Sequence, residues 1–134
     1  MEKVAGLIAR RVATLFPDTR QHIGVLVGPG HNGGDALVVA RELHFKGYTV
    51  SLYCPFPTLK DLTAKHHRYC KELGMRFVEA IEALQACDLL IDGLFGFGLE
   101  RSLDDAIAAT VNQINQFNMT CIVKRLILQQ PLLP

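Results

Sequence analysis

The sequence predicts an α/β domain of three layers, in which helices cover both faces of a mostly parallel sheet. Short apolar runs alternate along the chain with longer segments whose apolar residues recur at helical spacing. Glycine and proline separate many of these segments. The chain has 134 residues, enough for one compact domain and too few for two. Because strands that alternate with helices usually run parallel, we expect a single parallel sheet.

Five short runs, rich in apolar or β-branched residues, are expected to form the strands. They are residues 23–27, 48–53, 75–78, 89–91 and 120–123. The first stops at the turn Gly28-Pro29-Gly30, and the fourth runs into Asp92. The expected strand order is 3-2-1-4-5.

Helices are expected before and between these strands. The first ends before Pro17, because the residue ahead of a proline disfavours helical geometry. Its apolar residues at helical spacing are Val4, Leu7, Ile8, Val12 and Leu15. Residues 35–46 form the second helix, which Gly47 ends. Its inward residues are Leu37, Val38 and Leu43.

The third helix is expected at residues 58–73, where Thr58 and Asp61 are spaced like a capping box and Gly74 closes the helix. Residues 80–86 predict a short helix. The last helix begins at Ser102, with acidic residues in its first turn and an apolar inner stripe. These residues are Asp104, Asp105, Ile107, Val111 and Ile114.

A ligand site is expected between the first and fourth strands. In open parallel sheets, ligands bind beyond the carboxyl ends of the strands, where the strand order reverses. In the order 3-2-1-4-5 that point lies between strands 1 and 4. The two most unusual loops of the chain, residues 28–35 and 92–101, follow those two strands.

The first loop contains Gly28, Gly30 and Gly33, which match G-x-G-x-x-G. Two interpretations are open: a tight turn that needs glycines for positive φ, or a backbone cradle for an anion at a helix N-terminus. An ordinary dinucleotide site is disfavoured, because residues 53–56 lack the acidic residue that binds the ribose. Asp35, in the first helical turn, would also repel a pyrophosphate. With Asn32, it suggests polar recognition or oxygen ligation of a cation instead.

The second loop is rich in glycine and aromatic residues. Asp92 is either a polar strand terminus or, together with Asn32, a source of oxygens for a hard cation. Arg101 is expected either to bind a phosphate group or to be exposed to solvent. Phe95 and Phe97 can flank a ligand ring or pack in the core.

Composition narrows the function classes. Hydrophobic residues make up 49% and charged residues 20%, as in ordinary globular domains. The net charge is +1 and no basic run stands out, so we expect no nucleic-acid binding; His66-His67-Arg68 is expected on a solvated helix face.

With no leader or membrane segment recognised, a cytoplasmic location is the default. The four cysteines are expected to be reduced and mostly buried: Cys54, Cys70, Cys87 and Cys121.

These motifs resemble those of a known family. Residues 25–41, V-L-V-G-P-G-H-N-G-G-D-A-L-V-V-A-R, resemble the signature G-P-G-N-N-G-G-D-G-L-V-A-A-R of the NAD(P)H-hydrate epimerases, also called the YjeF N-terminal domain. Residues 90–99, L-I-D-G-L-F-G-F-G-L, resemble the second motif of that family, and residues 1–6 resemble the end of its first helix motif. The resemblance extends over residues 1–123.

The resemblance implies a Rossmann-like fold and an isomerase of metabolite repair. Such enzymes interconvert the R and S hydrates of NADH and NADPH (NADHX and NADPHX), so that a dehydratase, their functional partner, can restore the cofactor. The resemblance also implies a bound potassium ion, with Asn32 and Asp92 as its ligands. It does not identify the catalytic residue, and it leaves open whether the protein forms a homodimer. The implied nucleotide-binding residues, which contact the substrate, are His31, Asn32, Gly33, Gly34, Asp35, Gly96, Phe97, Gly98, Leu99, Glu100, Arg101 and Ser102.

The chain departs from the family pattern at three places. His31 replaces an asparagine and Ala36 replaces a glycine. After residue 123 the family reads V-D-I-P-S-G, whereas this chain reads K-R-L-I-L-Q-Q-P-L-L-P, with Leu126 where the acidic residue is expected. We therefore expect an incomplete domain at residues 1–123 and a divergent tail at 124–134, as from a truncated or frameshifted product or a mispredicted gene end. If the chain ends at residue 134, we expect weak or absent activity.

Two other functions were weighed against the epimerase. A non-catalytic nucleotide- or protein-binding module of the same fold is the alternative, although a pure scaffold would not need Asn32, Asp35 and Asp92. A conventional NAD-dependent oxidoreductase domain is disfavoured by the missing acidic residue after the second strand.

Overall fold

The computed structural model describes residues 2–94 and 124–127, with side chains described for residues 5–94. Five strands form one parallel sheet in the order β3-β2-β1-β4-β5, which confirms the predicted fold class and strand order. The strands are β1 (His22–Val27), β2 (Thr49–Tyr53), β3 (Arg76–Phe77), β4 (Leu89–Gly93) and β5 (Lys124–Ile127). The helices are α1 (Glu2–Leu15), α2 (His31–Phe45), α3 (Asp61–Glu72) and the 3-10 helix η1 (Ile81–Leu84).

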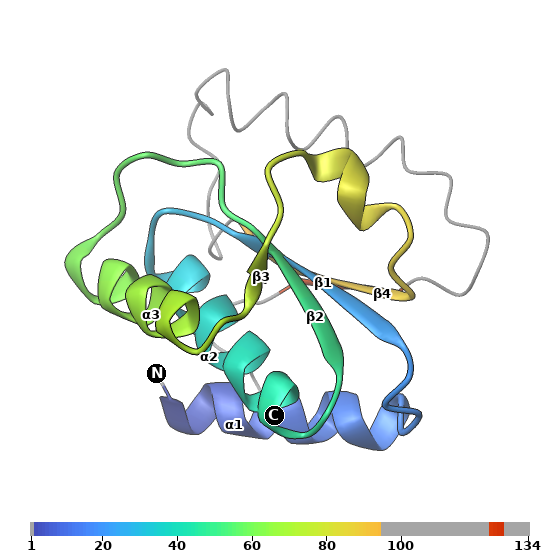
Figure 1. Ribbon diagram of the computed structural model, residues 1–134. Helices are drawn as coiled ribbons and strands as arrows, with labels where there is room; N and C mark the ends of the chain where they lie inside the picture. The colour runs from blue at the N-terminus through green and yellow to red at the C-terminus, as the bar shows by residue number, and fades with distance from the viewer. Residues whose placement is uncertain (1, 95–123, 128–134) are drawn as a thin grey trace.

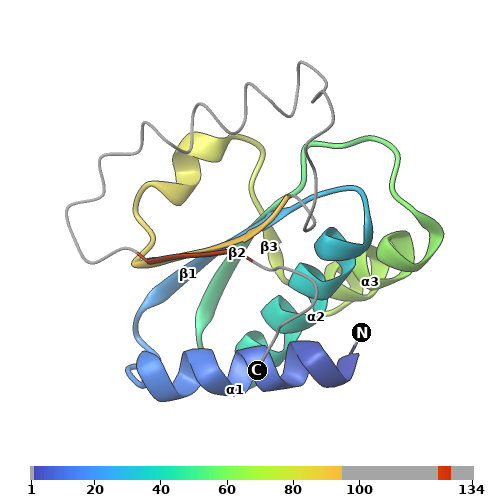
Figure 2. The same ribbon diagram turned by 180° about the vertical axis from the view of Figure 1, so that it is seen from behind.

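The described helices cover the two faces of the sheet unequally. α1, α2 and α3 lie on one face and η1 lies on the other (Figures 1 and 2). Side chains of β1 alternate between the two layers: Ile23, Val25 and Val27 join the core under the three α-helices, and Leu26 joins the smaller core under η1. The sheet is therefore buried on both sides, as expected for parallel strands.

α1 is an amphipathic helix that ends at Leu15, ahead of Pro17, as predicted. Its buried stripe differs from the predicted one. The core contacts come from Ala5, Ile8, Ala9 and Val12. Leu7 is 53% exposed, because the stripe with i, i+3, i+4, i+7 spacing leaves it on the outer side of the helix, and Leu15, the last helical residue, is 61% exposed.

α2 begins at His31 rather than at residue 35. The extended Gly30 precedes the helix and accepts the Gly34 N–H at 3.2 Å, so most of the predicted loop forms the first helical turn. The helix stops before Gly47, whose φ of +100° confirms it as the stop. Leu37, Val38 and Leu43 are buried, as predicted.

α3 starts at Asp61, and the predicted capping box at Thr58 and Asp61 is wrong, because no side chain caps this helix. Residues 54–60 form a loop whose end is tied to the first loop. The Lys60 N–H donates to the Pro29 carbonyl oxygen at 2.9 Å, and the Thr63 hydroxyl donates to the Gly30 carbonyl oxygen at 2.8 Å. The start of α3 is therefore set by contacts distant in sequence.

The last two described strands extend the predicted pattern. β4 continues to Gly93, so Asp92 lies within the strand. β5 is described at Lys124–Ile127, in the segment predicted to be a divergent tail, and pairs with β4. Residues 120–123, where the sequence predicts this strand, lie outside the described residues, as does the helix predicted from Ser102.

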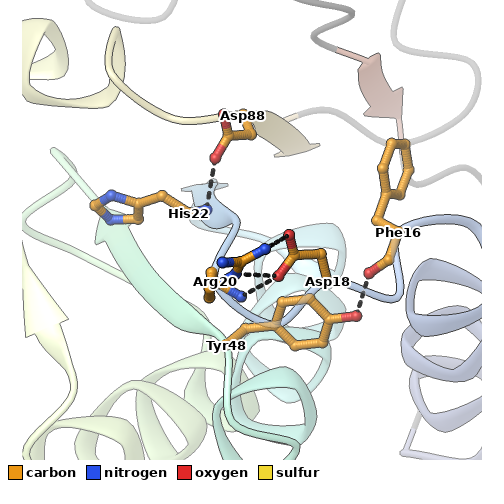
Figure 3. Close-up of polar contacts among 6 residues, drawn as sticks. All are labelled: Phe16, Asp18, Arg20, His22, Tyr48 and Asp88. Carbon is orange, nitrogen blue, oxygen red and sulfur yellow. Dashed lines mark hydrogen bonds and ion pairs between the residues drawn. The ribbon is translucent and has the colours of Figure 1, made fainter.

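The amino-terminal edge of the sheet is closed by hydrogen bonds (Figure 3). The His22 N–H donates to Asp88 Oδ2 at 2.8 Å, and the Asp88 N–H donates to the His22 carbonyl oxygen at 2.8 Å. The Tyr48 hydroxyl donates to the Phe16 carbonyl oxygen. These bonds fix the connections that enter β1, β2 and β4.

Two of the predicted buried thiols are confirmed. Cys70 and Cys87 are free and buried, and burial raises the pKa of each thiol to about 11. Cys54 is half-buried, with a thiol pKa that burial also raises. Cys121 lies outside the described residues. In the part of the chain that the structure describes, no helix is both long enough and apolar enough to span a bilayer.

Candidate functional site

The carboxyl ends of β1 and β4 lie side by side. The register pairs Leu26 with Asp92 and Val27 with Gly93. Beyond the strands, the Gly28 N–H continues the pairing with a hydrogen bond to the Gly93 carbonyl oxygen at 3.1 Å. The two loops predicted to form the site therefore start at one point, where β1 has β2 on one side and β4 on the other.

Three glycines let the backbones at this point approach closely. A Cβ on Gly28 would lie 2.5 Å from the Leu94 carbonyl oxygen. A Cβ on Gly33 would collide with the Gly28 carbonyl group, and one on Gly93 would collide with the Ala36 Cβ. Only Gly47 and Gly74 have positive φ within the described residues, so the turn interpretation based on positive φ is wrong. These glycines are required for space.

Gly30 differs from the other loop glycines. Among the residues that the structure describes, a Cβ placed there would meet nothing within 4 Å, and the following His31 is exposed. Its carbonyl oxygen is held by the Thr63 hydroxyl and the Gly34 N–H, so the position is fixed as well as open. A ligand can approach the backbone at the start of α2 here, next to the helix N-terminus.

Three polar side chains are buried beside this open position. Asn32 and Asp35, in the first turn of α2, are each 6% exposed, and Asp92 in β4 is 1% exposed. Asp92 Oδ1 accepts the Leu94 N–H at 3.0 Å, and a Cβ on Gly93 would lie 3.0 Å from the Asn32 carbonyl oxygen. The structure thus brings the predicted residues of the two loops together. Each of the three side chains has partners, as buried polar groups require.

The chemistry of these side chains favours a hard cation over a transition metal. Asn32 and Asp92 offer an amide and a carboxylate, oxygen donors of the kind that hard cations prefer. No group of three or more histidine, cysteine, aspartate or glutamate residues lies close enough together to hold a metal ion within the described segments. With a single carboxylate, the pair suits an ion of low charge.

The remaining predicted contacts lie outside the described residues. They are Gly96, Phe97, Gly98, Leu99, Glu100, Arg101 and Ser102. On the other side of β4, the register sets Ile127 beside Asp92 and Leu126 beside Ile91. The four residues of β5 include no acidic residue, so this described strand adds no second carboxylate beside Asp92.

The structure also places residues near the site that the sequence interpretation missed or misplaced. Thr63 is fully buried and holds Gly30, although a threonine in a helix gives little sequence signal of such a role. His66 is buried rather than solvated, with Nδ1 3.4 Å from Nη1 of the buried Arg41. The Arg41 guanidinium lies 4.7 Å from the Tyr69 ring centroid. These contacts join α2 to α3, which is why the His66-His67-Arg68 segment is only partly a solvated face.

The chain matches known proteins over the segments that build this site. Residues 1–124 match the profile of the family described as YjeF-related protein N-terminus. A bifunctional NAD(P)H-hydrate repair enzyme Nnr from Thermosynechococcus vestitus is 53% identical over 86% of this chain and 23% of its own length. An NAD(P)H-hydrate epimerase from Cryptococcus neoformans is 36% identical over 75% of this chain and 43% of its own length.

A solved structure agrees with the architecture. The crystal structure of the yeast protein ynu0 (YNL200c) superposes with a TM-score of 0.78 at 22% identity, over 94% of this chain and 58% of the yeast chain. At that identity the likeness supports the fold alone. The chain spans about a quarter of the length of the bifunctional relatives it matches.

Proposed function

This chain belongs to the YjeF-related protein N-terminus family, and we propose that it acts as an NAD(P)H-hydrate epimerase that interconverts the R and S hydrates of NADH and NADPH. The observation that carries the proposal is the burial of Asn32, Asp35 and Asp92 at the carboxyl ends of β1 and β4. The names of its relatives agree, since they describe repair and epimerisation of the same hydrates.

The carbon to be inverted carries a hydroxyl group and lies beside a ring nitrogen, and the reaction needs proton transfer to and from the oxygen of that hydroxyl group. When the C–O bond breaks, the departing hydroxyl takes up a proton and leaves as water, and the ring carries a positive charge. Water then adds to the opposite face and returns a proton. A buried carboxylate can hold and release that proton and offset the charge.

We assign the two buried carboxylates different tasks. Asp92 accepts the Leu94 N–H, which fixes its orientation at the end of β4. With Asn32 it would ligate potassium, which would supply a fixed positive charge beside the substrate. Asp35, one helical turn from the exposed His31, would contact the substrate directly.

The rest of the substrate contacts follow from the same placement. His31 would present its imidazole and Gly33 its N–H group at the start of α2, and Gly34, whose N–H donates to Gly30, would contact the substrate through the rest of its backbone. Residues 96–102 would supply the contacts from the second loop. A dehydratase would then restore the cofactor from its hydrate, and the bifunctional relatives are named as NAD(P)H-hydrate repair enzymes. The cytoplasmic location and a homodimer stay predictions.

A coupled assay tests the proposal. The full chain is added to a mixture of R and S NADHX together with a dehydratase that consumes only the S form. We expect the R form to disappear faster than by spontaneous epimerisation. An unchanged rate would refute catalysis by this chain.

Removing potassium provides an independent test of the ion. In 100 mM potassium chloride we expect a melting temperature about 3 °C higher than in the same concentration of tetramethylammonium chloride, because a bound ion stabilises the folded state. The double variant Asn32→Ala, Asp92→Asn should lose this difference. Equal potassium effects in both proteins would contradict the assignment.

A binding module without catalysis is the second candidate. It is favoured by one observation: β5 reads Lys-Arg-Leu-Ile and offers no carboxylate beside Asp92. Calorimetry with NADP separates the two candidates. Binding without acceleration in the coupled assay would favour the module.

A further inference from the structure

A second site is formed by the loop between β2 and α3. This loop, residues 54–60, leaves the carboxyl end of β2 and arches over to α3 (green in Figure 1). An open pocket of about 390 Å³ lies between the loop and α3. Its size falls within the range of small-molecule sites.

The two walls of this pocket, which we call the α3 pocket, differ in chemistry. The loop wall is apolar and includes Phe56, Pro57 and Leu59. The helix wall is basic, because His67, Arg68 and Lys71 line it, with Lys71 four residues after His67 and three after Arg68, at the spacings of neighbours on a helix. An apolar wall opposite a basic one suits a ligand with both a flat ring and an anionic group.

Aromatic contacts position two of the basic side chains of the α3 pocket, those of His67 and Lys71. The Lys71 ammonium lies 4.6 Å from the Phe77 ring centroid, and the His67 ring lies 4.7 Å from the same ring. Burial, followed by the neighbouring Lys71 charge, lowers the pKa of His67. Among the described residues no carboxylate forms an ion pair with Arg68 or Lys71.

The loop that lines the α3 pocket is hydrogen-bonded to the first loop. Leu59 lines the pocket, and the N–H of the next residue, Lys60, donates to the Pro29 carbonyl oxygen at 2.9 Å. Thr63, on the first turn of α3, holds Gly30. In doubly wound sheets the end of the second strand receives the adenosine ribose, with an acidic residue for a free 2′-hydroxyl or a basic one for a 2′-phosphate. Here residues 53–56 are not acidic, and the helix that follows is basic.

We propose that the α3 pocket binds a phosphomonoester through Arg68 and Lys71, and that in the substrate this group is the adenosine 2′-phosphate. The chain would then favour the hydrate of NADPH over that of NADH. The phosphate site follows from the pocket itself; the substrate preference rests on the proposed function.

Calorimetry on the full chain tests the phosphate site without any catalysis. The probes are adenosine 2′,5′-bisphosphate, adenosine 5′-monophosphate and inorganic phosphate. We expect the bisphosphate to bind at least about tenfold more tightly than the monophosphate, because charge-assisted hydrogen bonds to one more phosphate are gained. The double variant Arg68→Gln, Lys71→Gln should abolish this difference. Lys65→Gln, an exposed change on α3 outside the pocket, is the matched control and should keep it.

The outcomes separate the two parts of the proposal. Equal binding of bisphosphate and monophosphate, or a double variant that binds like the parent, would overturn the α3 pocket. Binding of inorganic phosphate as tight as that of the bisphosphate would keep the phosphate site and overturn its assignment to the cofactor.

Kinetics address the substrate preference. In the coupled assay, the double variant should raise the ratio of KM for NADPHX to KM for NADHX by about tenfold, and an unchanged ratio would overturn the preference. An inactive chain that still distinguishes the two adenosine probes would refute the proposed epimerase and keep the α3 pocket.

Discussion

Polar residues lie at both ends of the parallel strands, but their surroundings differ between the amino-terminal edge and the carboxyl-terminal edge of the sheet. At the amino-terminal edge, Asp88 and Tyr48 bond to backbone groups of neighbouring connections (Figure 3). At the carboxyl-terminal edge, glycines bring the backbones themselves into contact, and the polar side chains of Asn32, Asp35 and Asp92 are buried beside an open approach at Gly30.

The difference separates the polar residues that close the fold from those that lie where we propose the site. The Asp88 carboxylate accepts the His22 N–H at an edge where the chain only has to enter its strands. The carboxylates at the other edge are desolvated, which is costly unless their environment compensates the charge. Because ligands bind at the switch point of a parallel sheet, these buried carboxylates are the side chains that we propose form the site.

The largest effect is expected for Gly33→Ala at the carboxyl edge. The added Cβ would collide with the Gly28 carbonyl group, which cannot retreat because Gly28 is bonded to Gly93 and packed against Leu94. We expect the free energy of unfolding in urea to fall by about 3 kcal/mol. Gly30→Ala, in open space, is the control and should cost under about 1 kcal/mol. Equal losses would contradict the close-packing argument.

The next effect concerns activity. Asp92→Asn keeps the shape of the side chain but removes the charge that would hold potassium beside the substrate, so the epimerisation rate in the coupled assay should fall about 100-fold. Asp88→Asn makes the same chemical change at the amino edge and should leave the rate within about twofold of the parent. A comparable loss in both variants would mean that the two edges are not functionally distinct.

A smaller effect is expected for Asp88→Ala. It leaves the His22 N–H without its partner at 2.8 Å, so the free energy of unfolding should fall by about 1 kcal/mol. Urea denaturation measures this loss, and Asp88→Asn, which retains an acceptor oxygen, should recover most of it. If Asn gives no recovery, the bond to His22 is not what stabilises this edge.

The smallest expected effect is on the pH dependence of the free energy of unfolding, to which His22 at the amino-terminal edge of the sheet contributes. Burial, followed by the charge of Arg76, lowers the pKa of His22 below its ordinary value. The unfolded chain then binds the proton more readily, so this contribution to stability is present above about pH 6.5 and is lost as the pH falls through the lower folded pKa. Urea denaturation at pH 7.5 and 5 should show a smaller pH difference in His22→Gln than in the parent.

His67 must be separated from His22 in that measurement, since its pKa is also lowered by burial and by Lys71. The single variant His67→Gln and the double variant with His22→Gln complete the comparison. We expect the two reductions to add, because the residues contact different elements. A pH difference unaffected by His22→Gln would show that the amino edge does not titrate as described.

Much of the fold follows from the sequence because its causes are local. Apolar runs predict the strands β1, β2 and β4 nearly to the residue, and Gly47 and Gly74 mark helix ends where φ is positive. The start of α3 could not be found in this way. Thr58 and Asp61 have the spacing of a cap, but the tie of Lys60 to Pro29, between segments far apart in the chain, sets where the helix begins.

The glycine loop, residues 28–35, likewise has some features that follow from the sequence and others that only the tertiary structure explains. By itself the sequence determined the strand order, the meeting of the loops at Asn32 and Asp92, and the family resemblance, since residue types and spacing carry those signals. Only the tertiary structure decided why Gly28, Gly33 and Gly93 are glycines. None of the three has a positive φ, and each is required because a Cβ would collide with a neighbouring segment. The tertiary structure also decided that α2 starts at His31 and that the β2–α3 loop borders a basic pocket. Such contacts join distant segments, and no local pattern records them.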